Sequence, residues 1–155
     1  MQNDYREKLN ELGILGIVTY GNSMWPFIKN KKTSIIVLKK ENRLSRLDVA
    51  FYMRENGEYV LHRVLEVKEA GYIVCGDSQT EKEYVSEDSV IGILSGYYKG
   101  GKYVDCSDEA YKKAVEKWLT DPNREKKIKR YYNRLTFIPK IKSKIKRLFS
   151  FGKRK

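Results

Sequence analysis

The sequence predicts a mainly β fold, α+β overall, followed by a helical and strongly basic C-terminal extension. Seven short apolar runs separated by turn signals fill the first two thirds of the chain, which is typical of a β-barrel or sandwich. The basic residues gather at the other end: residues 110–155 carry 17 Lys or Arg and 3 Asp or Glu, a net charge of +14, whereas the whole chain carries +12. We therefore divide the chain into a β domain, residues 1–106, with a short N-terminal helix, and a basic helical extension, residues 107–155.

In chain order, the first expected element is a short amphipathic helix over residues 4–12, with Leu9 on its apolar side. The strands come next and are bounded by glycine-containing turns such as Glu55-Asn56-Gly57. The expected strands are residues 13–20, 33–39, 48–53, 58–67, 71–75, 89–95 and 98–104, with breaks at Gly96 and again at Gly100-Gly101. Strands this short and this numerous favour an all-β barrel or sandwich core.

The pattern changes to a helical period after Cys106. Ser107 is a suitable N-cap, and apolar residues then recur at the helical spacing up to Leu119. Asp121-Pro122-Asn123 is expected to end this helix. A second helix should run to Leu135, and Pro139 should open a third.

Three positions carry residue types suited to peptide-bond hydrolysis. Ser23 follows Gly21 at the end of the first predicted strand, where a hydroxyl is exposed and a backbone can approach closely. His62 is the single histidine, on the mostly apolar face of the strand 58–67, and imidazole is well suited to take a serine proton near neutral pH. Asp77 comes at the end of a later strand, where a buried carboxylate could orient the imidazole. Each residue also has an ordinary explanation as a turn or core residue.

Taken together, five segments resemble the sequence boxes of type I signal peptidases, in the family's order. They are Gly21-Asn22-Ser23-Met24-Trp25-Pro26, Asp48-Val49-Ala50-Phe51, His62-Arg63-Val64, Gly76-Asp77-Ser78 and Val90-Ile91-Gly92. They look like the family's G-x-S-M-x-P, G-D-I-V-x-F, H-R-V, G-D-N and V-x-G boxes. H-R-V belongs to the branch in which His replaces the catalytic Lys.

The resemblance, which extends to the clan of self-cleaving repressors, implies a coiled β-sheet barrel and a serine endopeptidase. Ser23 would be its nucleophile and His62 its general base. It also implies that Gly21 and Met24 contact a substrate bound as an added strand.

The resemblance leaves the third catalytic residue open. The His branch has an Asp several residues beyond G-D-N, but the corresponding stretch here reads Gln79-Thr80-Glu81-Lys82-Glu83. We therefore expect Asp77 to orient His62, with Glu81 or Glu83 as alternatives.

Composition narrows the function further. One histidine and two cysteines, Cys75 and Cys106, without CxxC spacing argue against a zinc site, and we expect no metal and no cofactor. No run approaches 18 apolar residues, and the N-terminus is unlike a secretory signal. We expect the membrane anchor common in the family to be missing. We therefore expect a cytoplasmic enzyme that processes a peptide or precursor protein and can lie on the inner membrane surface.

The main alternative is a non-catalytic basic module that binds a membrane surface or, less favoured, nucleic acid through the C-terminal helices. Residues 138–155 carry apolar side chains at helical spacing among many lysines and arginines; the apolar ones are Ile138, Ile141, Ile145, Leu148 and Phe149. The extension could instead pack on the β domain. A cysteine peptidase using Cys75 is the weakest alternative, because Cys75 lies within a strand and away from a glycine-rich turn.

Overall fold

The computed structural model describes residues 4–151, with side chains described for residues 4–137. Within that range the protein is mainly β, as predicted, and eight strands form one antiparallel sheet with three α-helices. The strands are β1 (Ile14–Val18), β2 (Ser34–Lys39), β3 (Val49–Met53), β4 (Tyr59–Lys68), β5 (Gly71–Cys75), β6 (Glu83–Ser86), β7 (Val90–Lys99) and β8 (Lys102–Asp105). The helices are α1 (Tyr5–Leu12), α2 (Glu109–Leu119) and α3 (Arg124–Phe151). The chain divides into two units, one ending at Leu119 and the other beginning at Thr120.

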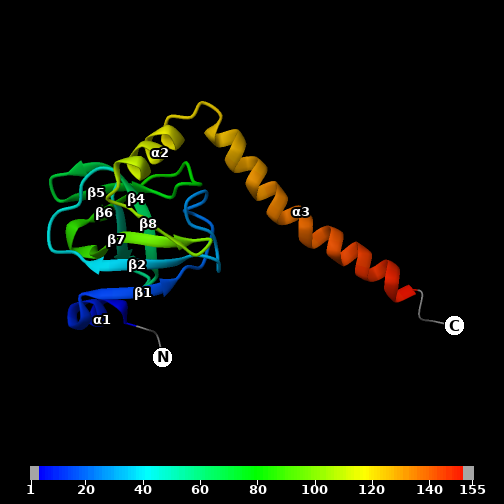
Figure 1. Ribbon diagram of the computed structural model, residues 1–155, viewed down its shortest axis with the longest axis horizontal. Helices are drawn as coiled ribbons and strands as arrows, with labels where there is room; N and C mark the ends of the chain where they lie inside the picture. Colours follow the sequence, from blue (N-terminus) through cyan, green and yellow to red (C-terminus); the bar gives the residue numbers. More distant parts are fainter. Residues whose placement is uncertain (1–3, 152–155) are drawn as a thin grey trace. The chain divides into compact units, whose positions relative to one another are not determined.

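The strand order is β1-β2-β7-β3-β4-β5-β6, with β8 paired to β7. In Figure 1 the strands curve around one another between α1, beside β1, and α2 at the other end of this unit. β1 and β6 are the two ends of the order, so across the described residues the sheet is not closed into the barrel that the resemblance implied. The two faces of the sheet bury separate cores.

The first core lies under α1 and α2 and includes Leu9, Val37, Phe51, Tyr111 and Val115. α1 begins after Asp4, whose carboxylate accepts hydrogen bonds from two backbone N–H groups of the first turn, as an N-cap does. The second core is centred on β3, β4 and β5, and its members are Leu44, Ala50, Tyr52, Val64, Tyr72, Val74, Val85 and Val90. Because successive side chains of a strand alternate between faces, His62 shares this second face with Val64, as the alternation of the strand predicted.

Two strand predictions are wrong. β6 was not expected, because its four residues are Glu-Tyr-Val-Ser and contain no apolar run. The break at Gly96 is absent, because β7 continues through Gly96, whereas the second expected break, at Gly100 and Gly101, is the turn between β7 and β8. A Cβ at Gly96 would lie 2.6 Å from the carbonyl oxygen of Val104 and would clash with the Tyr103 ring. The glycine therefore makes room for an aromatic ring within a strand and is not a breaker.

α2 belongs to the same unit as the sheet, so the predicted domain boundary after residue 106 lies too early. Tyr111, Val115 and Trp118 of this helix are buried. Ser107 is not the N-cap, because its N–H and hydroxyl both donate to Asp105 Oδ1 at 2.7 Å. The helix begins two residues later, and the carbonyl of Asp108 accepts its first hydrogen bond, from Lys112.

The second and third predicted helices are one continuous helix, α3. No Gly, Asn or Asp stands just before Pro139, and although the proline ring removes one hydrogen bond and crowds the preceding turn, its φ is itself helical. The apolar side chains singled out from Ile138 onwards lie outside the described side chains. Among the described residues, no helix is long and apolar enough to cross a membrane.

Candidate active site

Ser23 lies in the turn-rich connection between β1 and β2 and is partly exposed. Gly21 enters this turn with φ of +93°, in the left-handed region that favours glycine, and its N–H donates to Asn30 Oδ1 at 3.2 Å. On the other side of Ser23, the carbonyl of Met24 accepts the N–H groups of Phe27 and Ile28, at 3.1 and 3.0 Å. Ser23 is therefore presented by a turn that is fixed on both sides.

The 76–78 segment after β5 holds this turn. The Ser78 N–H donates to the carbonyl oxygen of Ser23 at 2.7 Å, and the Ser78 hydroxyl donates to the carbonyl oxygen of Asn22 at 2.7 Å. Gly76 is close as well, because a Cβ there would lie 2.8 Å from the Ser23 carbonyl oxygen. Two residues of the predicted G-D-N-like box, Gly76 and Ser78, thus touch or fix the serine turn.

The same segment is next to His62. Arg63 of β4 pairs with Cys75 of β5, so one further step along this antiparallel ladder brings His62 opposite Gly76. The structure therefore brings the Ser23 turn and the His62 strand to the same end of the β4–β5 pair. Ser23 and His62 are 39 residues apart in sequence, and the 76–78 segment is next to both of their boxes.

The His62 imidazole is buried, and its Nδ1 lies 2.9 Å from Glu83 Oε1 and 3.1 Å from the Tyr52 hydroxyl. The Tyr52 hydroxyl also hydrogen-bonds to Glu83 Oε1. These contacts are satisfied together when Nδ1–H and the tyrosine O–H both donate to the carboxylate. Nε2 is then the ring nitrogen that can accept a proton, which is the tautomer that a general base beside a serine needs.

Glu83 is the first residue of β6, and it is held by an arginine as well as by His62. Arg54 donates to both of its oxygens, from Nε to Oε2 at 3.2 Å and from Nη2 to Oε1 at 2.9 Å. Burial alone would raise the pKa of Glu83, but the hydrogen bonds from Arg54 and Tyr52 and the charge of Arg54 lower it below its ordinary value. The carboxylate beside His62 therefore stays ionised at neutral pH.

The pKa of His62 is lowered below its ordinary value of 6.5, mainly because burial penalises the charged imidazolium. Glu83 opposes this effect by hydrogen bonding and charge, and Arg54 adds to it. A pKa below 6.5 keeps His62 neutral at neutral pH. The imidazole can therefore act as a proton acceptor without first losing a proton.

Asp77 is not the carboxylate that hydrogen-bonds His62, which corrects the first choice made from the sequence. Its two oxygens accept hydrogen bonds from Arg63 Nε and Nη2, at 2.7 and 2.6 Å, and both side chains are fully buried. Arg63 also donates to the Leu47 carbonyl and the Tyr111 hydroxyl, at 2.8 and 3.1 Å. Glu83, one of the two alternatives, occupies the position beside His62.

The remaining expected residues have mixed outcomes. Gly21 is exposed at the entry to the serine turn, whereas Met24 is buried in the first core, which argues against a direct substrate contact. Cys75 and Cys106 are not joined in a disulfide bond, and Cys75 is buried within β5. Tyr52 and Arg54 were not expected at this site. Their only signal was parity, since Tyr52 pairs with Val60 on β4 and so faces the same side as His62, two residues along.

No protein-family model matches the chain, and neither a curated protein nor a solved structure is significantly similar to it. Within the part of the chain whose side chains are described, no group of three or more His, Cys, Asp or Glu is arranged to hold a metal ion. The function is therefore argued from the site itself.

Proposed function

We propose that this protein is a serine endopeptidase in which Ser23 is the nucleophile, His62 the general base and Glu83 the carboxylate that orients His62. The observation that carries the proposal is the buried imidazole, with Nδ1 on the Glu83 carboxylate at 2.9 Å, next to a strand-end serine turn fixed by residues 76–78. A histidine packed only for stability needs no ionised carboxylate clamped by an arginine. The likeness of the sequence boxes to type I signal peptidases supports the same assignment.

In the proposed reaction, Ser23 Oγ attacks the carbonyl carbon of the scissile bond while its proton passes to His62 Nε2. The imidazolium, stabilised by Glu83, gives this proton to the leaving amine, and the C–N bond breaks to leave an ester on Ser23. Water then attacks the ester with His62 as base, and the serine hydroxyl is restored. No cofactor is needed for these steps.

The substrate would bind in an extended conformation along β1. This strand is at the end of the sheet order, and the chain runs from it directly to Ser23, whereas β4 is flanked by β3 and β5. An added strand would gain main-chain hydrogen bonds, and the exposed side chains of Ile14, Val18 and Tyr20 would supply apolar contacts. We expect small residues just before the cleaved bond, as the resemblance implies.

The test is cleavage of a diverse peptide library by the full chain, read by mass spectrometry. The wild type and Ser45→Ala, which alters an exposed serine of the loop before β3, should cleave the same bonds. Ser23→Ala and His62→Ala should each lose roughly 10⁴-fold or more in rate while remaining folded. Cleavage by Ser23→Ala at more than a tenth of the wild-type rate would rule out the proposal.

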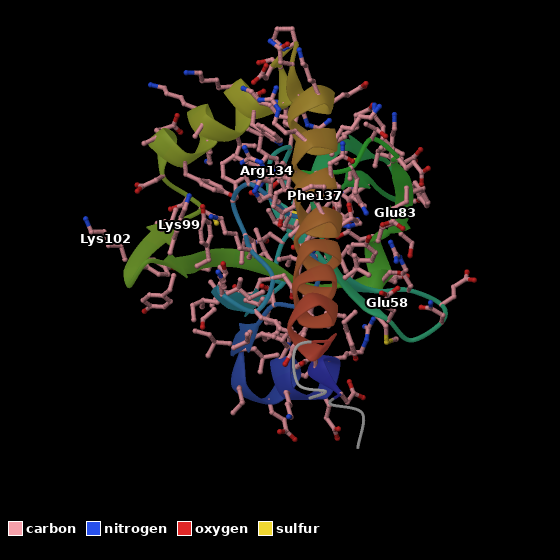
Figure 2. The ribbon with its side chains drawn as sticks, turned by 90° about the vertical axis from the view of Figure 1, so that its right-hand side faces the viewer. Glu58, Glu83, Lys99, Lys102, Arg134 and Phe137 are labelled. Carbon is pink, nitrogen blue, oxygen red and sulfur yellow. The ribbon has the colours of Figure 1, made fainter. Side chains whose placement is uncertain are left out.

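A second candidate, a basic module that binds an anionic membrane surface, is favoured by α3. This helix forms its own unit, and its 28 residues include 11 Lys or Arg and 1 acidic residue. Because they are spaced three and four residues apart, several residues of this helix share one face: Lys126, Lys129, Arg130, Asn133, Arg134 and Phe137. Figure 2 labels two of them, Arg134 and Phe137. The two functions are compatible, because they use different parts of the chain.

A further inference from the structure

Arg54 and the buried His62 imidazole share one carboxylate partner, Glu83. Arg54 lies just beyond the end of β3, and its guanidinium makes two hydrogen bonds to Glu83 and one, from Nη1 at 2.9 Å, to Glu58 Oε2. A guanidinium bonded to both oxygens of a carboxylate fixes the plane of that carboxylate as well as its position. Figure 2 labels Glu58 and Glu83, the two residues that hold Arg54.

Glu83 Oε1 is shared by three donors: Arg54 Nη2, His62 Nδ1 and the Tyr52 hydroxyl. The position of this one oxygen therefore determines how well the imidazole is oriented. We propose that Arg54 is a positioning residue, which holds Glu83 in the orientation that makes His62 a base and moderates the attraction between Glu83 and the imidazolium. This inference rests on the proposed peptidase function.

Burial of His62 makes it sensitive to the charges of Glu83 and Arg54. The His62 side chain is 5% exposed, whereas those of Glu83 and Arg54 are 32% and 37% exposed. The Arg54–Glu83 pair is thus partly exposed to solvent, whereas the imidazole beside it is buried. Interactions of a buried group with nearby charges are screened less than interactions at the surface. A change at an accessible side chain can therefore alter the proton affinity of an inaccessible one.

The groups that act on His62 come from three places in the sheet. Glu83 of β6 favours the imidazolium, Arg54 opposes it, Tyr52 of β3 is a neutral hydrogen-bonding neighbour, and Asp77 after β5 adds a weaker favourable charge. Asp77 is committed to Arg63. Removing the charge of Arg54 leaves Glu83 unopposed, so the pKa of His62 should rise, and removing the charge of Glu83 should lower it.

Because His62 is the single histidine, its imidazole nitrogens give one set of signals in the NMR spectrum of the full chain. We would titrate these signals in the wild type, Arg54→Gln, Arg54→Lys and Glu83→Gln. Arg46→Gln is the matched control, since Arg46 is also paired with a carboxylate, that of Glu116. The midpoint should rise in Arg54→Gln, rise less in Arg54→Lys, fall in Glu83→Gln and stay at the wild-type value in Arg46→Gln. The wild type should show the Nδ1–H tautomer.

Activity gives a second readout. A rise in the pKa of the base moves the acid limb of the pH–rate profile to higher pH, so the rate at pH ~5.5 relative to pH ~7.5 should fall about threefold or more in Arg54→Gln. The conservative Arg54→Lys variant keeps the positive charge but cannot bond both oxygens of Glu83 with a planar guanidinium. Its rate ratio should therefore lie between those of the wild type and Arg54→Gln.

The two proposals fail separately. If folded Arg54→Gln and Arg54→Lys both titrate like Arg46→Gln, the role of Arg54 is wrong even if Ser23 proves to be the nucleophile. If the midpoints move as expected but Ser23→Ala still cleaves peptides, the coupling stands and the peptidase assignment falls. Should Arg54→Gln not fold, the Arg54→Lys and Glu83→Gln midpoints decide, and wild-type values in both would overturn the inference.

Discussion

Two carboxylates near the serine turn, Glu83 and Asp77, have different partners and different exposure. Glu83 is one-third exposed and faces the imidazole, whereas Asp77 is fully buried and neutralises Arg63. Removing one partner of a buried ion pair leaves an uncompensated charge, which costs far more than loss of a surface contact. Catalysis and stability should therefore be separable by substitution at these two positions.

We expect Glu83→Gln to lose about 10²–10⁴-fold in kcat with a nearly unchanged free energy of unfolding, because the imidazolium loses its counter-charge. Asp77→Asn should lose about 3–5 kcal/mol of stability, because the Arg63 charge is left unpaired. Urea unfolding and kcat measured on the same samples check both. A stable, inactive Asp77→Asn together with an active Glu83→Gln would restore Asp77 to the role first expected of it.

The sequence was sufficient to single out Ser23 and His62 as candidates, because both belong to boxes with a local meaning, and the alternation of β4 predicted the face on which His62 lies. It was not sufficient to choose between Asp77 and Glu83. That choice depends on which strand lies beside β5 and in what register, and β6 has no apolar pattern that would reveal it.

At the scale of the elements, α2 completes the β unit. Its Tyr111 hydroxyl accepts a hydrogen bond from Arg63, and its Trp118 Nε1–H donates to the Asp77 carbonyl at 2.8 Å. The ring of Trp118 also meets Trp25 of the serine turn edge to face, with centroids 5.3 Å apart. The amphipathic stripe of this helix was visible in the sequence, but the partner of that stripe was not, because it is assembled from β4, β7, the segment after β5 and the serine turn.

A chain ending at Cys106 should therefore fail to fold cooperatively, whereas a chain ending at Thr120 should fold like the full chain. The shorter chain exposes the first core where Tyr111 and Val115 pack and leaves the Arg63 and Asp77 network open, and burial of each large side chain is worth about 1.5–3 kcal/mol. Thermal unfolding followed by circular dichroism distinguishes the two. Equal stability of both chains would place the boundary after residue 106 after all.

At the scale of the whole molecule, charge is divided between the two units. Residues 1–119 carry 18 Lys or Arg and 18 Asp or Glu, so the net charge of +12 belongs to residues 120–155. This asymmetry could be read directly from the sequence. The number of helices in the C-terminal part could not be predicted correctly, because Pro139 suggested the start of a new helix at a point where α3 continues.

We expect full-length protein to sediment with phosphatidylserine-containing vesicles at low salt, because each Lys or Arg near an anionic surface contributes about 1 kcal/mol and salt screens it. The chain ending at Thr120 should remain in the supernatant. Neutral phosphatidylcholine vesicles are the control and should bind neither chain. Equal sedimentation of the two chains would show that α3 is not a membrane-binding element, and tighter binding to nucleic acid than to vesicles would favour the other anionic partner.

The central claim, that neutral His62 takes the proton of Ser23, is tested most directly by comparing two measurements of one ionisation. The acid limb of kcat/KM reports the pKa of the essential base in the free enzyme, and NMR titration of the single histidine reports the pKa of His62 itself. Because burial lowers the pKa of His62, we expect both midpoints to lie below 6.5 and to coincide, with the rate falling in proportion to the loss of neutral imidazole as pH drops. A kcat/KM that stays constant through the NMR midpoint of His62 would contradict the account.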